Sequence, residues 1–394
     1  MKGRWIRLVV AAVAVSVPAA IGGSAEAGRA SSTGASPIKV GIIYSRSGLL
    51  SAYGAQYVQG LRLGLQYATK GGKVNGRAIQ ITTVDDGGDP AKAVSAAKDL
   101  IGQGYKIIAG STSSGVALQL APLAEQNKVL FISGPAAADA ITGANRYTFR
   151  SGRQSLQDVL AVKEILGKAS ARKITVFAQD TAFGTGNFAA VNSVLGGRGH
   201  AVSRILVPLS ANDFTPFAEQ VKQSRPDLLF VAWAGTTAPA MWRALEQQKV
   251  TDATKIATGL AERATWGSYA PGIDFLSHYV PEAPKNKVND WLKARMKRLN
   301  QSPDIFTPDG FNAALMITRA AATGGDDVDK MVSALEGYQF IGPKGPSRVR
   351  AEDHALLQPM FQVRLRQAGG KFTAVPVKTF SPGNLQPPVR AFSS

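Results

Sequence analysis

The chain has 394 residues, of which 45% are hydrophobic, and it contains no cysteine. This length and apolar content suffice for two domains held together by burial alone, and the lack of cysteine excludes disulfides, thiolate metal sites and a cysteine nucleophile. The formal net charge is +18, but the basic residues are scattered over predicted helix faces, which argues against nucleic acid as a partner.

The first 36 residues predict export. A basic start is followed by an apolar run over residues 8–21 and by the small-residue pattern Ala25-Glu26-Ala27. This order is typical of a secretory signal peptide, here residues 1–27, because the apolar run is shorter than the roughly 20 residues of a membrane anchor, the alternative interpretation. Residues 28–36 are rich in Gly, Ser and Ala and predict a flexible leader. We therefore expect the protein in the periplasm or on the extracellular side of the cell envelope, where its positive charge would attract anionic envelope surfaces.

From residue 38 onwards, strand-like and helix-like segments alternate. Short runs rich in Ile, Val and Leu predict strands, and apolar residues at helical spacing predict the helices between them. In the first unit we expect strands at 38–43, 79–84, 106–109 and 129–132 and helices at 54–68, 90–103 and 114–126. Asp89 and Pro90 predict the start of the second helix, with the aspartate as its N-cap. This order is typical of a parallel sheet that helices cover on both faces.

The same order starts again near residues 147–150. It predicts helices at 156–166, 187–195, 214–223 and 237–247 and strands at 174–178, 201–207, 228–232 and 255–258. Two further helices at 288–299 and 311–323 and a β-ribbon at 360–365 and 374–377 follow. The predicted fold class is therefore α/β, with two doubly wound parallel-sheet lobes.

Small and hydroxylated residues follow the predicted strands, where open parallel sheets bind ligands. In the first unit Ser113 and Ser114 lie in the segment Gly110–Gly115, at the start of a helix. Free backbone N–H groups and the helix dipole would combine there with the hydroxyls into a site for an anion or polar group, and plain N-capping is the alternative. In the second unit Trp233 follows a strand close to Gly235, so we expect it to stack on a ligand unless it only fills the core.

Several of these segments also carry a resemblance to a known family. The matching stretches are Val40-Gly41-Ile42, Tyr53-Gly54, Asp85-Asp86, Gly110 with Ser113-Ser114, Tyr147-Thr148-Phe149-Arg150, Phe183-Gly184 and Pro226-Asp227. In their order and spacing the chain resembles the branched-chain amino acid-binding family of periplasmic solute-binding proteins.

The resemblance implies a fold and a role. The fold would be type I periplasmic-binding-protein-like, with a three-strand hinge that joins the two lobes and closes them on a ligand. The implied role is that of an ABC transporter substrate-binding protein. The lobes would comprise residues 37–150 plus 281–355 and residues 151–280 plus 356–394, with crossovers near 150–153, 276–281 and 355–359.

The resemblance also implies ligand-binding residues. Amino acid-binding members hold the ligand carboxylate with a serine and a threonine, and its ammonium with a tyrosine and a glutamate. Ser114, with Ser113 beside it, matches the serine, and Tyr53 matches an aromatic contact on the first lobe. The positions of the threonine, tyrosine and glutamate correspond to Ala137, Phe183 and Thr237.

These departures weaken the case for an amino acid ligand without excluding it. A buried ammonium needs a negative charge or several acceptors, which Phe183 and Thr237 do not supply, although Asp180 or Glu262 could. We therefore expect an aromatic, aliphatic or weakly polar ligand, with a carboxylate held by the two serines and by Arg150 or Arg263. The predicted ligand-binding residues are Tyr44, Tyr53, Ser113, Ser114, Ala136, Ala137, Phe183, Trp233, Thr237 and Glu262.

Catalytic and cofactor motifs do not find their required context in this sequence. Residues 184–189 match G-x-G-x-x-A, but five residues separate them from the preceding strand, whereas a dinucleotide fold needs the first glycine directly after it. The three histidines lack metal-ligand spacing, and Asp85-Asp86 fits a turn better than a magnesium site.

We expect a monomer without enzymatic activity, cofactor or metal, whose partners are a small-molecule ligand and ABC transporter permease subunits. A ligand-sensing receptor or co-regulator on the same fold is the alternative function, and an exported hydrolase is the third.

Overall fold

The computed structural model describes residues 35–69, 71–167, 173–196, 200–270 and 272–392. The predicted signal peptide and residues 28–34 of the predicted leader lie outside these ranges. Across the described ranges, none of the helices has the length and apolar content needed to span a membrane.

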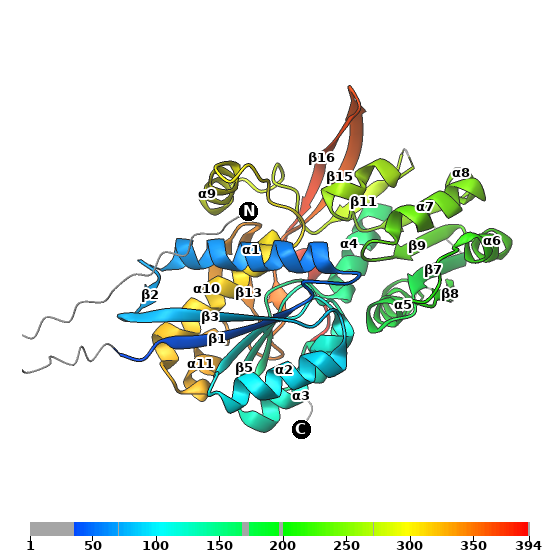
Figure 1. The fold of residues 1–394 in the computed structure, drawn as a ribbon. Coiled ribbons are helices and arrows are strands. Elements are labelled where there is room, and N and C mark those ends of the chain that lie inside the picture. Colours follow the sequence, from blue (N-terminus) through cyan, green and yellow to red (C-terminus); the bar gives the residue numbers. More distant parts are fainter. Residues whose placement is uncertain (1–34, 70, 168–172, 197–199, 271, 393–394) are drawn as a thin grey trace, which may run out of the picture. The chain divides into compact units, whose positions relative to one another are not determined.

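The first lobe is built on a sheet with the strand order β2-β3-β1-β4-β5-β6, in which only β2 is antiparallel to its neighbour. Its strands are β1 (Ile38–Tyr44), β2 (Lys73–Val74), β3 (Arg77–Asp85), β4 (Ile107–Gly110), β5 (Leu130–Ser133) and β6 (Thr148–Arg150). Its helices include α1 (Ser51–Ala68), α2 (Pro90–Gly102) and α3 (Ser114–Asn127). Figure 1 shows α1 on one side of the strands and α2 with α3 on the other. Because helices cover both faces, β1 is buried along nearly its whole length.

Two later helices complete the first lobe: α10 (Thr307–Gly324) and α11 (Val328–Leu335). Helix α10 lies tightly against α1, since a Cβ atom at Gly60 would be 1.9 Å from the carbonyl oxygen of Thr307. It begins four residues earlier than predicted because Pro308 occupies its first turn, where a missing N–H costs nothing. This contact ties a late part of the chain to the first sheet and positions residues 304–306 beside the cleft described below.

The second lobe is built on a parallel sheet with the strand order β10-β9-β7-β8. Its strands are β7 (Lys173–Gln179), β8 (Ala201–Val207), β9 (Leu228–Ala232) and β10 (Lys255–Thr258). Its helices are α4 (Ser155–Leu166), α5 (Ala182–Val194), α6 (Thr215–Ser224), α7 (Ala238–Gln247) and the short α8 (Val250–Ala253). Helix α5 begins five residues earlier than predicted because the side chain of Thr181 caps it by accepting from Gly184 N.

Antiparallel strands lie at and beyond the connections between the lobes. One sheet has the order β11-β15-β16 and another the order β12-β13-β14. Their bounds are β11 (Asp274–Ser277), β12 (Gln339–Gly342), β13 (Gly345–Val349), β14 (Leu356–Leu357), β15 (Met360–Ala368) and β16 (Lys371–Phe380), with helix α9 (Lys287–Lys297) between β11 and α10. The ribbon of β15 and β16 confirms the predicted ribbon and extends beyond its predicted ends, and Figure 1 shows it projecting from the body of the molecule.

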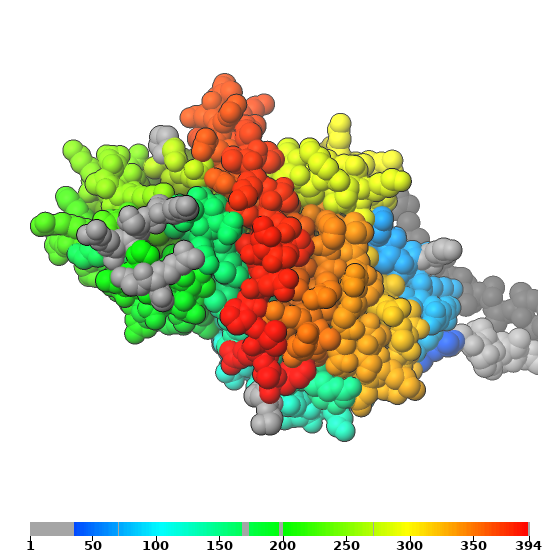
Figure 2. Space-filling view, turned by 180° about the vertical axis from the view of Figure 1, so that it is seen from behind, coloured from blue at the N-terminus to red at the C-terminus, as the bar shows by residue number. Residues whose placement is uncertain are grey.

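The C-terminal segment returns from this ribbon along the back of the molecule, where Figure 2 shows it between the two lobes. Leu385 packs into the core of the second lobe, and the carbonyl of Pro387 accepts from Arg350 Nη1. Further on, Arg390 N donates to Asp353, and the ring of Phe392 lies against His354. The segment therefore contacts both lobes, and the predicted lobe boundaries stay a prediction. The predicted class, α/β with two parallel-sheet lobes, is confirmed.

Candidate ligand-binding cleft

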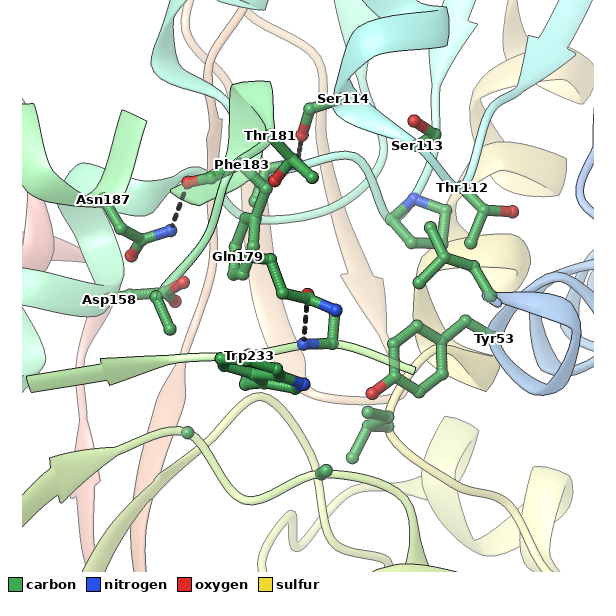
Figure 3. Close-up of a pocket in the computed structure, with 18 of the residues that line it drawn as sticks. Tyr53, Thr112, Ser113, Ser114, Asp158, Gln179, Thr181, Phe183, Asn187 and Trp233 are labelled. Atoms are coloured by element: carbon green, nitrogen blue, oxygen red, sulfur yellow. Dashed lines mark hydrogen bonds between the residues drawn. The ribbon is translucent and has the colours of Figure 1, made fainter. Parts of the chain in front are cut away.

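A cleft lies where the carboxyl ends of the strands of both lobes face each other. It encloses about 1270 Å³ of empty space, including space open to solvent. Residues from the ends of β4 and β5 and the starts of α1 and α3 line its first-lobe side, and residues from the ends of β7, β9 and β10 line its second-lobe side. Figure 3 shows the labelled side chains converging on this space. The position agrees with the general rule for open parallel sheets.

The start of α3 forms the polar part of the first-lobe wall. Ser113 is its N-cap residue, yet its side chain makes no capping hydrogen bond. The hydroxyl oxygen of Ser114 accepts from Ala137 N and Ala138 N, both at 3.2 Å, which leaves its own proton free to be donated. The first N–H groups of the helix lack intrahelical partners and face the same end. The wall therefore offers hydrogen-bond donors without a formal charge, which suits an anionic group.

Contacts between the lobes close one edge of the cleft. The carbonyl of Leu49 accepts from Thr236 N at 3.2 Å, and the hydroxyl of Tyr53 accepts from Gly235 N at 3.3 Å. The ring of Tyr53 also lies against Phe306, with centroids 4.7 Å apart. We call these pairs, Leu49 with Thr236 and Tyr53 with Gly235, the latch. Because each pair joins the first lobe to the second, the latch can form only when the lobes are together.

The second-lobe wall is largely apolar, although Gln179, Thr181, Asn187 and Thr258 also line it. The ring of Trp233 lines the cleft and packs on Phe177 and Phe214, with centroids 5.3 Å apart in both cases. Its indole Nε1 donates to the hydroxyl of Thr237 at 3.0 Å. Trp233 thus combines the two roles that the sequence left open, a cleft-lining ring and a core side chain. Other apolar side chains on this wall are those of Val162, Phe183, Leu209, Phe230, Val231, Leu260 and Leu276.

Three ionisable side chains line the hinge end of the cleft: Arg153, Asp158 and His278. Arg153 Nε donates to His278 Nε2 at 3.0 Å and lies 3.4 Å from Asp158 Oδ2. Burial, followed by the charge of Arg153, lowers the pKa of His278 to about 4, so this imidazole is neutral at pH 7. Burial alone would raise the pKa of Asp158, but Arg153 and His278 together hold it below its ordinary value. The cluster therefore carries one positive and one negative charge.

The predicted site residues divide into two groups. The residues that line the cleft are Tyr53, Ser113, Ser114, Ala137, Phe183 and Trp233. The lining does not include Tyr44, which is part of the first-lobe core, or Ala136, whose carbonyl accepts from Arg150 Nη2. Thr237 lies behind Trp233 as its hydrogen-bond acceptor. Glu262 is buried near the latch, where burial raises its pKa and its Oε2 has no hydrogen-bond partner within the described ranges.

The arginines proposed for the ligand carboxylate also lie outside the lining. Both Nη groups of Arg150 donate to backbone carbonyls, those of Ala136, Ala138 and Arg153, and so hold the first crossover. The guanidinium of Arg263 lies 5.0 Å from the ring centroid of Trp266. Arg153 lines the cleft instead.

Sequence reasoning missed the hinge cluster, together with Gln179 and Asn187 on the second-lobe wall. Arg153 and His278 both fall in predicted crossovers, but they are 125 residues apart, and no local pattern joins them. Asp158 lies on α4 and reads as an ordinary polar position of a helix. Only their positions in the predicted crossovers could have indicated that Arg153 and His278 lie close together.

Asp85 and Asp86 order a turn, as the sequence favoured. Asp85 Oδ1 accepts from Arg46 N, Ser47 N and Gly87 N, and Asp86 Oδ1 accepts from Gly88 N and the hydroxyl of Ser45. In the part of the chain that the structure describes, no group of three or more His, Asp or Glu side chains could hold a metal ion.

Comparisons with known proteins give a consistent result. The family model described as periplasmic binding protein matches residues 37–371. The Leu/Ile/Val-binding protein BraC3 of Rhizobium johnstonii is 24% identical over 313 residues, which cover 77% of this chain and 84% of that protein. The crystal structure of an ABC-type branched-chain amino acid transporter protein from Rhodopseudomonas palustris is 32% identical and covers 90% of this chain and 99% of its own, with a TM-score of 0.73.

A second solved structure is similar in fold. It is a solute-binding protein of an ABC transporter from Rhodopseudomonas palustris in complex with p-hydroxybenzoic acid. It is 22% identical, covers 88% of this chain and 97% of its own, and has a TM-score of 0.80.

Proposed function

Because this chain belongs to the periplasmic binding protein family, we propose that its cleft captures a small aromatic or apolar carboxylate for an ABC importer. The family supplies the role, which is that of a substrate-binding protein. The observation that carries the choice of ligand is the contrast between the cleft walls. Uncharged hydrogen-bond donors at the start of α3 face an aromatic wall around Trp233 and Phe183.

The carboxylate binds at the start of α3 in this proposal. Ser114 is already oriented by two backbone N–H groups and donates its proton, and the free hydroxyl of Ser113 donates beside it. The helix N-terminus favours the negative charge. No nearby counter-charge is needed, because several donors to one carboxylate stabilise its ionised form.

The ligand body lies against the second-lobe wall. The ring of Trp233 is held in place by Phe177, Phe214 and Thr237, so its exposed face is fixed before the ligand arrives. A flat apolar ligand gains from such a preorganised surface because little side-chain entropy is lost on binding. The p-hydroxybenzoic acid complex of a protein with the same fold supports an aromatic acid, whereas the name of the Rhizobium johnstonii relative supports leucine, isoleucine or valine as competitors.

Capture proceeds by closure of the lobes. A ligand that touches both walls binds the closed arrangement more tightly than the open one and shifts the population toward it. The latch contributes to the closed state because its hydrogen-bonded pairs join the two lobes. The closed protein then delivers the ligand to permease subunits.

The remaining parts of the proposal concern place, partners and division of the chain. We propose export, a monomeric state and lobes of residues 37–150 plus 281–355 and 151–280 plus 356–394. The high positive charge would favour anionic envelope surfaces. No catalytic step is assigned to the cleft, since the histidine that lines it is bonded to Arg153 rather than to a serine.

A thermal-shift screen of the purified chain tests the ligand class. Benzoate, 4-hydroxybenzoate, aliphatic acids and leucine are compared at equal concentration, because a ligand at a hundred times its Kd stabilises by about 2.7 kcal/mol. We expect aromatic acids to raise the Tm most. Stabilisation by leucine and by no aromatic acid would overturn the proposed ligand class.

A further inference from the structure

We propose that Arg153, Asp158 and His278 form a second polar subsite, which takes a ligand hydroxyl that donates to Asp158 and accepts from Arg153. This inference rests on the proposed function and extends it from an aromatic acid to a hydroxylated one. The three side chains, which we call the hinge cluster, come from different parts of the chain: the first crossover, helix α4 and the segment after β11. They line the cleft together.

The hinge cluster has unused hydrogen-bonding capacity. Arg153 donates from Nε to His278 Nε2 and from Nη1 to the carbonyl of Pro135, and its Nη2 has no bond within the described ranges. Asp158 Oδ1 lies 3.3 Å from His278 Nε2 but has no hydrogen-bond partner by geometry, and its Oδ2 lies 3.4 Å from Arg153 Nε. Both distances exceed the roughly 2.7–2.9 Å of a strong charge-assisted hydrogen bond.

Because the hinge cluster is buried, its unpaired donors and acceptors reduce the stability of the protein. Arg153, Asp158 and His278 are 4%, 5% and 6% exposed. Charged groups at such depth lose their hydration, and each donor or acceptor left without a partner reduces stability. A ligand group that bonds to both Arg153 and Asp158 would restore these interactions, so the cluster favours a ligand that carries one.

The charge balance decides what that group is. With His278 neutral, the charges of Arg153 and Asp158 cancel. The other buried charges around them balance as well, since Arg150 interacts with Asp139 and Asp309, and Lys344 interacts with Asp309. A second carboxylate or an ammonium would bring an uncompensated charge into this region. A hydroxyl is neutral and both donates and accepts, so it fits the subsite.

The two poles of the cleft therefore select different groups. The start of α3 takes the ligand carboxylate, and the hinge cluster takes the hydroxyl. The ligand class that follows is a hydroxylated aromatic acid. A site that bonds to a hydroxyl discriminates strongly against the analogue without it, because the buried partners are then left unpaired.

Calorimetric titrations of the purified chain with 4-hydroxybenzoate and with benzoate test this subsite. We expect the wild-type protein to bind 4-hydroxybenzoate at least about 10-fold more tightly than benzoate. In Asp158→Asn that ratio should fall toward one, while the Kd for benzoate stays within about threefold. The ratio is the informative readout, because a merely structural role of Asp158 would weaken both acids together.

Two further variants control the experiment. Ser113→Ala should weaken both acids by the same factor and leave their ratio unchanged, because Ser113 belongs to the carboxylate pole. If Asp158→Asn does not fold, His278→Gln takes its place as the test variant, because it keeps the Arg153–Asp158 pair. It should lower the ratio of the two affinities several-fold, since it removes the imidazole to which Arg153 Nε donates. Equal binding of the two acids by the wild-type protein, or an unchanged ratio in the folded cluster variant, would overturn the subsite but not the proposed function. If the wild-type protein bound neither acid, the proposed function would fall, and the subsite with it.

Discussion

The two lobes have similar architecture, but their walls of the cleft differ in chemistry. On the first-lobe wall, Ser113 and Ser114 point donors into the cleft from the start of α3. On the second-lobe wall, Gln179 and Trp233 turn their polar atoms inward, toward Ala234 N and Thr237. Most of the side chains that line this wall are apolar, and the ring of Trp233 is one of them. The difference indicates that the first lobe recognises the carboxylate of the ligand and that the second lobe recognises its apolar part.

Neither wall suffices alone in this arrangement. A carboxylate on the first-lobe wall would still face water, and hydrogen bonds to it strengthen when the surroundings are dry. A ring on the second-lobe wall gains its full hydrophobic contribution only when it is covered on both faces. Binding and closure are therefore coupled, and substitutions in either wall or in the latch should lower affinity by different routes.

Loss of the aromatic wall should have the largest effect. We expect Trp233→Ala to weaken binding of an aromatic acid by about 100-fold, since it removes the ring face and the packing behind it. Because the ring also packs on Phe177 and Phe214, the free energy of unfolding should fall by about 2–4 kcal/mol.

Trp233→Phe is the matched control, measured by calorimetry and by urea denaturation. It keeps an aromatic ring and loses the bond to Thr237, so affinity should fall by about 10-fold or less. Full affinity in folded Trp233→Ala would show that Trp233 serves only the core.

A substitution that adds a Cβ atom within the latch should have the next largest effect on affinity. In Gly235→Ala the new Cβ would lie 2.3 Å from the carbonyl oxygen of Leu49 on the other lobe. We expect an affinity loss of about 10-fold or more, because the clash exists only when the lobes are closed.

Gly272→Ala provides the control for backbone strain. Gly235 and Gly272 have nearly equal φ angles, +82° and +83°, but an added Cβ at Gly272 meets nothing within 4 Å. Both variants should lose about 1–2 kcal/mol of stability to the left-handed conformation, and only Gly235→Ala should lose affinity. Equal affinity of the two variants would exclude the latch from closure.

The smallest effect is expected on the first-lobe wall. Ser113→Ala removes one donor whose oxygen makes no capping bond, so affinity should fall by about 3- to 10-fold with stability unchanged within about 0.5 kcal/mol. Ser114→Ala should cost more in both quantities, because it also leaves Ala137 N and Ala138 N without their acceptor. If Ser113→Ala destabilised the fold without changing affinity, Ser113 would be a structural cap rather than a ligand contact.

Local patterns in the sequence predicted most of the fold. The strands of both lobes follow from short Ile- and Val-rich runs, and the start of α2 follows from Asp89, whose carboxylate accepts from Ala91 N and Lys92 N. The starts of α5 and α10 were misplaced because the Thr181 cap and the first-turn Pro308 begin these helices before their apolar repeat. These errors are of the kind that local reasoning produces at helix ends.

The cleft was predictable only in part, for a physical reason. Ser113, Ser114 and Trp233 follow strands directly, so the rule for parallel sheets found them. Arg153 and His278 meet only after both crossovers have formed, and their pairing depends on the tertiary structure. The resemblance directed attention to Thr237, which accepts from Trp233 Nε1 and is not part of the cleft lining.

Small-angle X-ray scattering of the purified chain, with and without saturating 4-hydroxybenzoate, tests most directly whether the two walls close on an aromatic acid. The account predicts a smaller radius of gyration with the acid for the wild-type protein and for Gly272→Ala, and little change for Gly235→Ala. An unchanged radius for the wild-type protein at a concentration that calorimetry shows to be saturating would contradict it.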